Sequence, residues 1–182
     1  MRIENRRSQI KKPEVKRSRV FILVFLFSLL FVPRMQAQFE GTFGLGVHAG
    51  YGATINSIGA GVHAHYYYTN NIRFVPSFTS FLEVKGKCMW MTDADAHYIF
   101  PISYSASLYP IAGFHYSQWK YNPPKNDNRS EDSWKKHRPG ANLGLGFQYD
   151  IAYRVRANFE FKYQFIPDYS QLFITAGIGF WF

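Results

Sequence analysis

Cysteine is almost missing from this sequence. Cys88 is the only one in 182 residues, which excludes an intramolecular disulfide. Charged residues are also scarce, at 18% against about 25% in typical globular domains, whereas aromatic residues reach 19%. The mean hydropathy of −0.23 is too low for a helical membrane protein. It is compatible with a membrane barrel, because lipid-facing and lumen-facing residues alternate and cancel in such an average.

An evenly distributed basic charge is missing too, although the net charge is +9. Residues 1–37 hold nine of the 21 Lys and Arg residues and two of the 12 Asp and Glu residues. The remaining chain therefore carries twelve basic and ten acidic residues. A nucleic-acid-binding domain would show its basic excess on the folded part of the chain. This distribution argues against nucleic acid as a partner.

The N-terminal segment has the three parts of a secretory signal peptide. A basic region is followed by the apolar run Val20–Val32, and "MQA" then offers a cleavage point after Ala37. Thirteen apolar residues are fewer than the ~20 that a transmembrane helix needs, although an uncleaved anchor is the alternative. We therefore predict a signal peptide over residues 1–37 and a single exported domain over residues 38–182.

Helical periodicity is missing after residue 38. Instead, apolar and polar residues alternate in segments that end at turn residues, which is typical of β-strands. The sequence predicts eight strands, over residues 39–51, 58–68, 72–84, 88–100, 104–119, 141–149, 153–165 and 171–182.

The composition of the two strand faces favours a membrane barrel over a soluble barrel or sandwich. Aromatic residues stand at both ends of several apolar faces, as in Tyr153 and Phe165, and resemble the girdles at membrane interfaces. The opposite faces combine glycine with charged residues, which suits a narrow packed lumen. The longest connection, residues 120–140, joins the fifth and sixth strands and would lie outside the cell. We predict an all-β, eight-stranded antiparallel up-and-down transmembrane barrel in the cell outer membrane.

The stretches "HYIFPI", "LYPIAGFHYS" and the final "AGIGFWF" resemble the outer membrane protein β-barrel domain family. In that family, a C-terminal aromatic residue preceded by alternating apolar residues is similar to the signal read by the barrel assembly machinery. This resemblance implies that Phe180 and Phe182 form the assembly signal and face lipid, whereas Trp181 points inward by parity. It also implies the assembly machinery and outer-membrane lipid as partners.

Polar residues of the inward faces predict a charged network that fills the lumen, because buried charges must be paired. Eight strands enclose an interior just wide enough for side chains, so an open pore is not expected. We expect a structural network without metal or other cofactor, although His63, His65 and the acidic residues are suitable metal ligands by type. The predicted lumen residues are His63, His65, Asp93, Asp95, His97, Arg154, Arg156, Glu160 and Lys162.

The long outer connection is the predicted interaction surface, since its cations could pair with the phosphates of lipopolysaccharide. The function expected is therefore a structural or surface-interaction role for a monomeric barrel that is not an enzyme. An accessory barrel of a secretion apparatus is the main alternative. A lipid A-modifying enzyme is a weaker one, because His115 and Ser117 resemble the His-x-Ser motif of the lipid A 3-O-deacylase family but face the lumen. The surface-loop residues are Lys120, Trp134, Lys135, Lys136 and Arg138.

Overall fold

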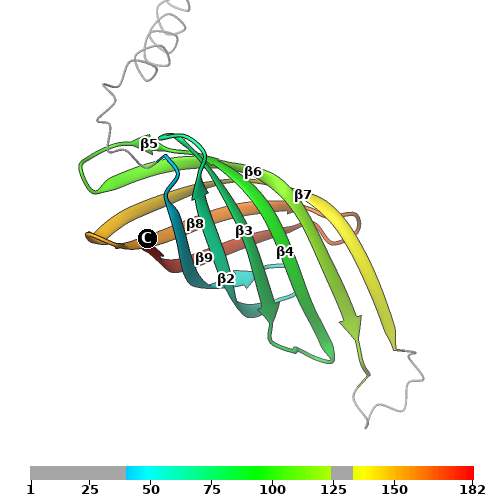
Figure 1. Cartoon of the computed structure of the whole chain (residues 1–182). Coiled ribbons are helices and arrows are strands. Elements are labelled where there is room, and N and C mark those ends of the chain that lie inside the picture. Colours follow the sequence, from blue (N-terminus) through cyan, green and yellow to red (C-terminus); the bar gives the residue numbers. More distant parts are fainter. Residues whose placement is uncertain (1–39, 124–132) are drawn as a thin grey trace, which may run out of the picture. The chain divides into compact units, whose positions relative to one another are not determined.

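The computed structural model describes residues 40–123 and 133–182, which form one closed antiparallel barrel (Figure 1). The predicted signal peptide lies outside the described residues. Eight long strands build the barrel wall, and a two-residue strand adds to one end. Their bounds are β1 Phe43–Gly52, β2 Ser57–Tyr67, β3 Ile72–Phe81, β4 Lys87–Tyr98, β5 Phe100–Pro101, β6 Ala106–Tyr121, β7 Trp134–Ala152, β8 Val155–Phe165 and β9 Gln171–Trp181.

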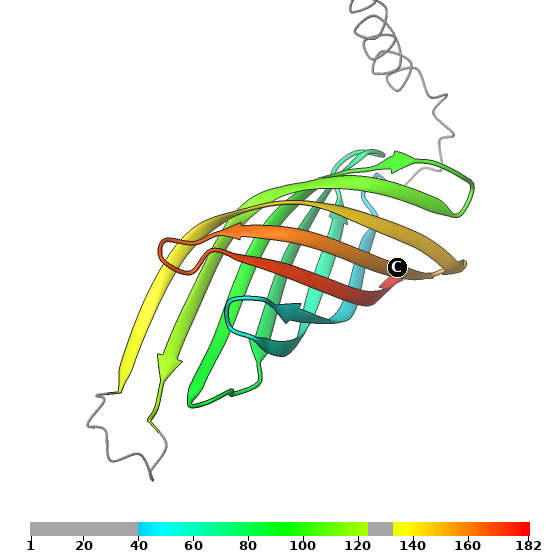
Figure 2. The same cartoon turned by 180° about the vertical axis from the view of Figure 1, so that it is seen from behind.

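Two non-sequential pairings close the sheet. The first and last strands pair along most of their length, from Gly44↔Trp181 to Gly52↔Phe173. On the other side β4 pairs with β6, with β5 continuing that pairing at Phe100↔Leu108. The two opposite views show the sheet curving back on itself (Figures 1 and 2). Closure gives each of the eight long strands two neighbours, and the prediction of eight barrel strands is confirmed.

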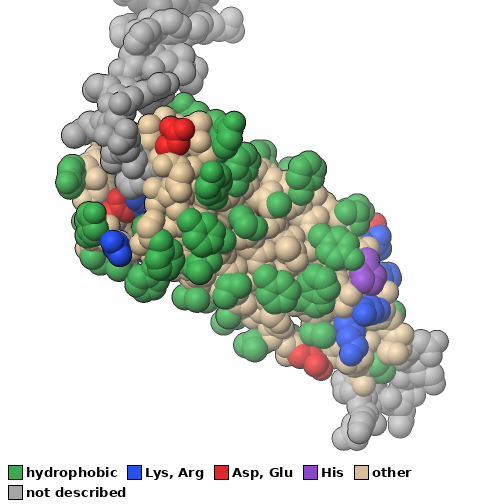
Figure 3. All heavy atoms as spheres, in the orientation of Figure 1, with side chains coloured by type: hydrophobic (Ala, Val, Ile, Leu, Met, Phe, Trp, Pro, Cys, Tyr) green, Lys and Arg blue, Asp and Glu red, His purple; other side chains and the backbone are tan. Residues whose placement is uncertain are grey.

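The alternation of residues along each strand separates an apolar exterior from a filled interior. Large apolar side chains cover the outside, for example Val47, Phe114 and Leu145, which are 59%, 79% and 65% exposed. Their neighbours along the chain point inward and are glycine or histidine. The space-filling view shows hydrophobic side chains over the wall and cations gathered at one end (Figure 3). Such an exterior is stable only in an apolar solvent, which agrees with the predicted lipid-facing parity.

Two prolines, Pro76 and Pro110, interrupt hydrogen-bonded ladders of the barrel wall. The β2–β3 register continues from His63↔Ser77 to Tyr66↔Phe74 but omits the pairs around Pro76. A similar gap at Pro110 separates the pairing of β6 with β4 from its pairing with β5. Proline has no backbone N–H to donate, so these positions cost a ladder bond without shifting the register.

The two ends of the barrel differ in their connections. Turns 68–71, 102–105 and 153–154 lie at the end where β1 begins and β9 ends, called here the terminal end. The opposite end carries segments 53–56, 82–86, 122–133 and 166–170 and is called the loop end. Outer-membrane barrels have short periplasmic turns and longer outer loops, which assigns the loop end to the cell exterior.

The predicted loop 120–140 is too long, because the strands on both sides extend into it. Strand β7 begins at Trp134 and pairs with β6 from Tyr121↔Trp134 onward, so residues 120–121 and 134–140 of this segment belong to a β-ribbon that projects past the rest of the wall. The sixth strand was predicted only over residues 141–149, because alternation is lost in the charged run "KKHR". Ladder pairing with β6 extends the strand regardless of that pattern. The described residues contain no helix long and apolar enough to cross a membrane.

Candidate functional site

The interior is closed at both ends by apolar clusters that the sequence did not predict. The loop-end cluster contains Met91, Trp119 and Phe173, which are 0%, 2% and 1% exposed, together with Ile55, Phe81 and Met89. The terminal-end cluster contains Tyr67, Ile99, Tyr109, Ile111 and Trp181. The prediction of a polar lumen therefore holds only for the middle of the barrel. Inward parity of these large apolar residues was the available signal.

Lys162 is the centre of the polar middle. Its Nζ lies 2.9 Å from Asp95 Oδ2, 3.4 Å from Asp93 Oδ2 and 3.8 Å from Glu160 Oε2. The side chains of Lys162, Asp93 and Asp95 are at most 5% exposed. Three carboxylates thus share one ammonium group in a region from which water is largely excluded. Removing one member of such a buried pair leaves an uncompensated charge and costs far more stability than breaking a pair at the surface.

Each of the three carboxylates also receives a further donor from β6 or β7. His115 Nδ1 lies 2.7 Å from Asp93 Oδ1, and Asn142 Nδ2 donates to Asp95 Oδ1 over 2.8 Å. Tyr109 donates its hydroxyl to Glu160 Oε1 over 2.9 Å. These contacts join four strands of the wall through the lumen. They satisfy the hydrogen-bonding capacity that buried carboxylates require.

Two arginines occupy the lumen toward the terminal end. Arg73 is 0% exposed and donates to Gln148 Oε1 over 2.8 Å, and its Nη2 lies 2.9 Å from His97 Nδ1. Its guanidinium also lies over the Tyr109 ring at 4.9 Å. No carboxylate forms an ion pair with it among the described residues. Polarizable rings and neutral acceptors therefore hold this charge.

Arg156 has the partners that Arg73 lacks. It makes a two-point contact with the Asp150 carboxylate and donates to the Tyr67 hydroxyl over 2.7 Å. Its guanidinium lies 4.6 Å from the centre of the Trp181 ring. The arginine thereby connects the inner turn of the β7–β8 hairpin to the terminal-end cluster.

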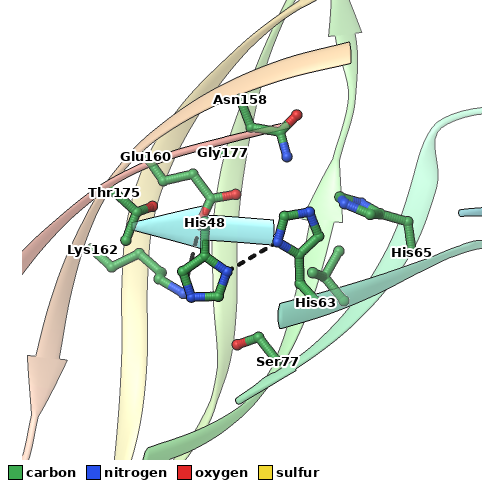
Figure 4. A pocket seen from close by; sticks show the side chains of 10 residues that line it. His48, His63, His65, Ser77, Asn158, Glu160, Lys162, Thr175 and Gly177 are labelled. Carbon is green, nitrogen blue, oxygen red and sulfur yellow. Dashed lines mark hydrogen bonds and ion pairs between the residues drawn. The ribbon is translucent and has the colours of Figure 1, made fainter. Parts of the chain in front are cut away.

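Three histidines line a small cavity between these charged groups. His48 Nδ1 lies 3.0 Å from His63 Nδ1, and the rings of His63 and His65 meet edge to face at 4.5 Å. The cavity of about 20 Å³ is also bordered by Glu160 and Lys162 (Figure 4), and a space of that size admits a single water molecule. Within residues 40–123 and 133–182 no group of His, Cys, Asp or Glu side chains is arranged to hold a metal ion.

The structure places eight of the nine predicted lumen residues inside the barrel. Seven are buried, and Glu160 is partly buried. The prediction for Arg154 is wrong, because it lies in the turn after β7 and its side chain is exposed over the ring of Tyr153. The predicted strand 153–165 began two residues too early, because residues 153 and 154 form the turn before β8. Three further lumen residues were not predicted from the sequence, namely His48, Gln148 and Gln164.

His115 and Ser117 both face the lumen but do not form a nucleophile–base pair. The Ser117 hydroxyl donates to the carbonyl of Arg138 over 3.4 Å and accepts from Trp119 Nε1 over 3.1 Å. His115 Nδ1 instead lies 2.7 Å from Oδ1 of Asp93, a residue of the barrel wall, and this pairing was not predicted from the sequence. The arrangement holds both side chains in the packed interior and leaves the serine without an activating base.

The predicted surface residues divide between the two faces of the β6–β7 ribbon. By the alternation of the strands, Lys120 and Lys135 point outward, whereas Trp134, Lys136 and Arg138 share the inward face. The inward cations lie against aromatic rings of the loop end. Lys136 Nζ is 4.9 Å from the Trp134 ring, and Arg138 lies 5.5 Å from the Tyr169 ring and 3.0 Å from Asp168.

A closed eight-stranded antiparallel barrel with an apolar exterior and a charged, filled interior defines a small transmembrane β-barrel. The chain belongs to the outer membrane protein β-barrel domain family, which matches residues 22–182. The protein is therefore a small barrel of the outer membrane, as the sequence predicted.

Solved structures share this fold at low sequence identity. The N-terminal β-barrel domain of Pseudomonas aeruginosa OprF matches with a TM-score of 0.66 at 17% identity and covers 79% of this chain and 98% of its own. Neisserial surface protein A matches with a TM-score of 0.60 at 14% identity, covering 79% and 98%. The attachment invasion locus protein Ail of Yersinia pestis matches with 0.58 at 17%, covering 79% and 99%. No curated protein matches the chain. Identities this low show the fold alone.

Proposed function

We propose that this protein is a closed, non-enzymatic barrel that acts at the outer surface of the envelope by binding lipopolysaccharide through its basic loop end. The observation that carries the proposal is the contrast between the two regions of the molecule. The lumen is filled and closed by apolar clusters at both ends, whereas the loop end concentrates cations. The cations there are Lys85, Lys87, Lys120, Lys135, Lys136 and Arg138.

The charge balance of the loop end supports an anionic partner. Among its described residues only Glu83 and Asp168 are acidic, and Asp168 is already paired with Arg138. Lipopolysaccharide phosphates are the abundant anions at this level of the outer leaflet, and ammonium groups bind phosphate as point charges. Ail, a barrel of the same fold, was solved in complex with the heparin analogue sucrose octasulfate. Binding of a polyanion therefore has a precedent in a barrel of this fold.

The wild-type protein should conduct no ions across a membrane and should bind lipopolysaccharide. Reconstituted in a planar bilayer, it should give no stepwise conductance, because buried apolar clusters occupy both ends of the lumen. In detergent micelles, labelled lipopolysaccharide should bind it, and added salt should weaken binding since exposed charges are screened within about 10 Å at 0.1 M salt. Stable open channels, or lipopolysaccharide binding that salt leaves unchanged, would contradict the proposal.

Replacing Ser117 by alanine should leave the lipid A of the host cell unchanged. The serine hydroxyl is committed to the Arg138 carbonyl and the Trp119 indole, and no base activates it. Mass spectra of lipid A from cells with wild-type protein, with Ser117→Ala and without the protein should therefore be identical. An acylation difference that depends on Ser117 would establish an enzyme instead.

A further inference from the structure

The outward face of the β6–β7 ribbon changes character over three consecutive cross-strand pairs. Tyr116 is opposite Pro139, Gln118 is opposite His137, and Lys120 is opposite Lys135. The side chains therefore pass from mainly apolar to polar to cationic as the ribbon leaves the barrel. This order follows the sequence of layers in a membrane leaflet, from hydrocarbon through interface to charged headgroups.

The position of the lysine pair relative to the membrane follows from the apolar run below it. On β6 the outward residues are apolar from Leu108 to Tyr116, where Leu108 is 48% and Phe114 79% exposed. A tilted strand crosses the hydrocarbon with about 9–11 residues. The apolar run uses that length, so Lys120 and Lys135 lie beyond the hydrocarbon at the level of the headgroups.

An aromatic platform marks the interface directly below the lysines. Trp90 of β4 donates its indole N–H to Gln118 over 3.1 Å, and its ring centre lies 5.9 Å from that of Tyr116. The Tyr116 hydroxyl is 2.6 Å from His137 Nδ1. Aromatic side chains with a polar tip are characteristic of membrane interfaces. The platform fixes the ribbon at that depth and holds the lysine pair one pleat above it.

The pairing of Lys120 with Lys135 is unfavourable by itself. Directly opposed residues on one face have Cβ atoms about 5 Å apart, and like charges at that spacing destabilise a ribbon. Neither lysine forms an ion pair with any described residue, and both are exposed. An anion placed between the two ammonium groups would convert this repulsion into attraction.

We infer that Lys120 and Lys135 together bind one phosphate group of a lipopolysaccharide molecule lying against the outside of β6 and β7. The acyl chains of that molecule would lie along the apolar run and the aromatic platform, and its phosphate would reach the lysines from the headgroup layer. This inference rests on the proposed function and deepens it, because it assigns binding to two of the six loop-end cations. Lys136 and Arg138 face the mouth of the lumen and take no part.

Paired variants test the assignment. Labelled bis-phosphorylated lipopolysaccharide binds the full-length protein in detergent micelles, and the apparent Kd is measured by fluorescence anisotropy. Lys120→Gln with Lys135→Gln should raise it about twenty- to thirtyfold, since each lysine near an anionic surface contributes roughly a fivefold change. Lys136→Gln with Arg138→Gln removes the same charge from the same ribbon but should change the Kd by about threefold or less.

A charge reversal separates binding from folding. Lys135→Glu creates an opposite-charge pair with Lys120, so this variant should unfold at the same temperature as wild type or higher while binding is lost. Equal losses in both double variants, binding unchanged when the lipid A phosphates are removed, or equal competition by phosphatidylglycerol vesicles would each overturn the phosphate assignment. Absence of binding by the wild type would instead overturn the proposed function itself.

Discussion

Replacing Lys162 by methionine should lower the free energy of unfolding by about 3–5 kcal/mol, the usual result of removing one member of a buried ion pair. Methionine has nearly the length of lysine and leaves no large cavity. The carboxylates of Asp93, Asp95 and Glu160 would remain in the lumen without the ammonium group that lies within 4 Å of each. Urea titration of the refolded barrel, followed by the mobility difference between unheated and heated samples, measures the change.

Two further variants show whether charge is the cause. Arg154→Gln removes a cation from an exposed turn of the same hairpin and should change stability by about 0.5 kcal/mol or less. Adding Asp95→Asn to Lys162→Met removes the carboxylate nearest to the missing ammonium and should recover part of the loss. If Lys162→Met unfolds at the same urea concentration as Arg154→Gln, the network does not hold the barrel together.

The wall of the barrel could be predicted from the sequence, because the alternation of apolar and polar residues indicates which side chains face lipid. Val47 and Leu145, for example, stand on the apolar faces of two predicted strands, and both are more than half exposed. The same parity placed Trp181 inside, where it is 8% exposed. A one-residue slip would turn every side chain to the other face, so the register of a half-polar strand is strongly specified.

Contacts across the lumen could not be read from the pattern, since parity states the face of a residue and not its partner. His63 and Asp93 share an interior, yet His63 contacts His48, whereas Asp93 contacts His115 and Lys162. Which residues meet depends on strand tilt and on side-chain length across a closed barrel. The apolar clusters at the ends were missed for a related reason, because an inward methionine or tryptophan breaks the expected polar alternation without changing the register.

The β6–β7 ribbon shows where alternation itself is lost. Its outer part contains "WKKHRPG", in which charged residues stand on both faces. This segment therefore lacks the row of apolar residues on one face that predicts a strand. The segment is nevertheless paired along its length, because the neighbouring strand supplies the hydrogen bonds. Outside the hydrocarbon no face has to be apolar. Charge on both faces is thus compatible with a strand, and the resulting ribbon separates the outward lysines from the inward Lys136 and Arg138.

Deleting Phe182 should leave most of the protein outside the membrane in cells while hardly changing the stability of the barrel once it is folded. Phe182 is 72% exposed, and its backbone N–H donates to the carbonyl of Phe43 over 2.9 Å, so its loss removes about one hydrogen bond, worth roughly 1 kcal/mol. The deleted chain still ends in an aromatic residue, Trp181. That residue faces the lumen, so the terminal aromatic would be out of phase with the outward apolar row that ends in Phe180.

Trp181→Ala is the matched control because it keeps Phe182 but removes a buried side chain, so it should affect the stability of the folded barrel and not its insertion. The indole packs against Tyr67, with ring centres 5.2 Å apart, and against the Arg156 guanidinium at 4.6 Å. Truncating a buried tryptophan costs about 3–5 kcal/mol, so this variant should insert but unfold at lower urea concentration. Outer-membrane fractions, read by heat-dependent gel mobility, report insertion, and urea titration of refolded protein reports stability. Normal insertion of the Phe182 deletion would show that the outward phase of the last aromatic residue is not what the assembly machinery reads.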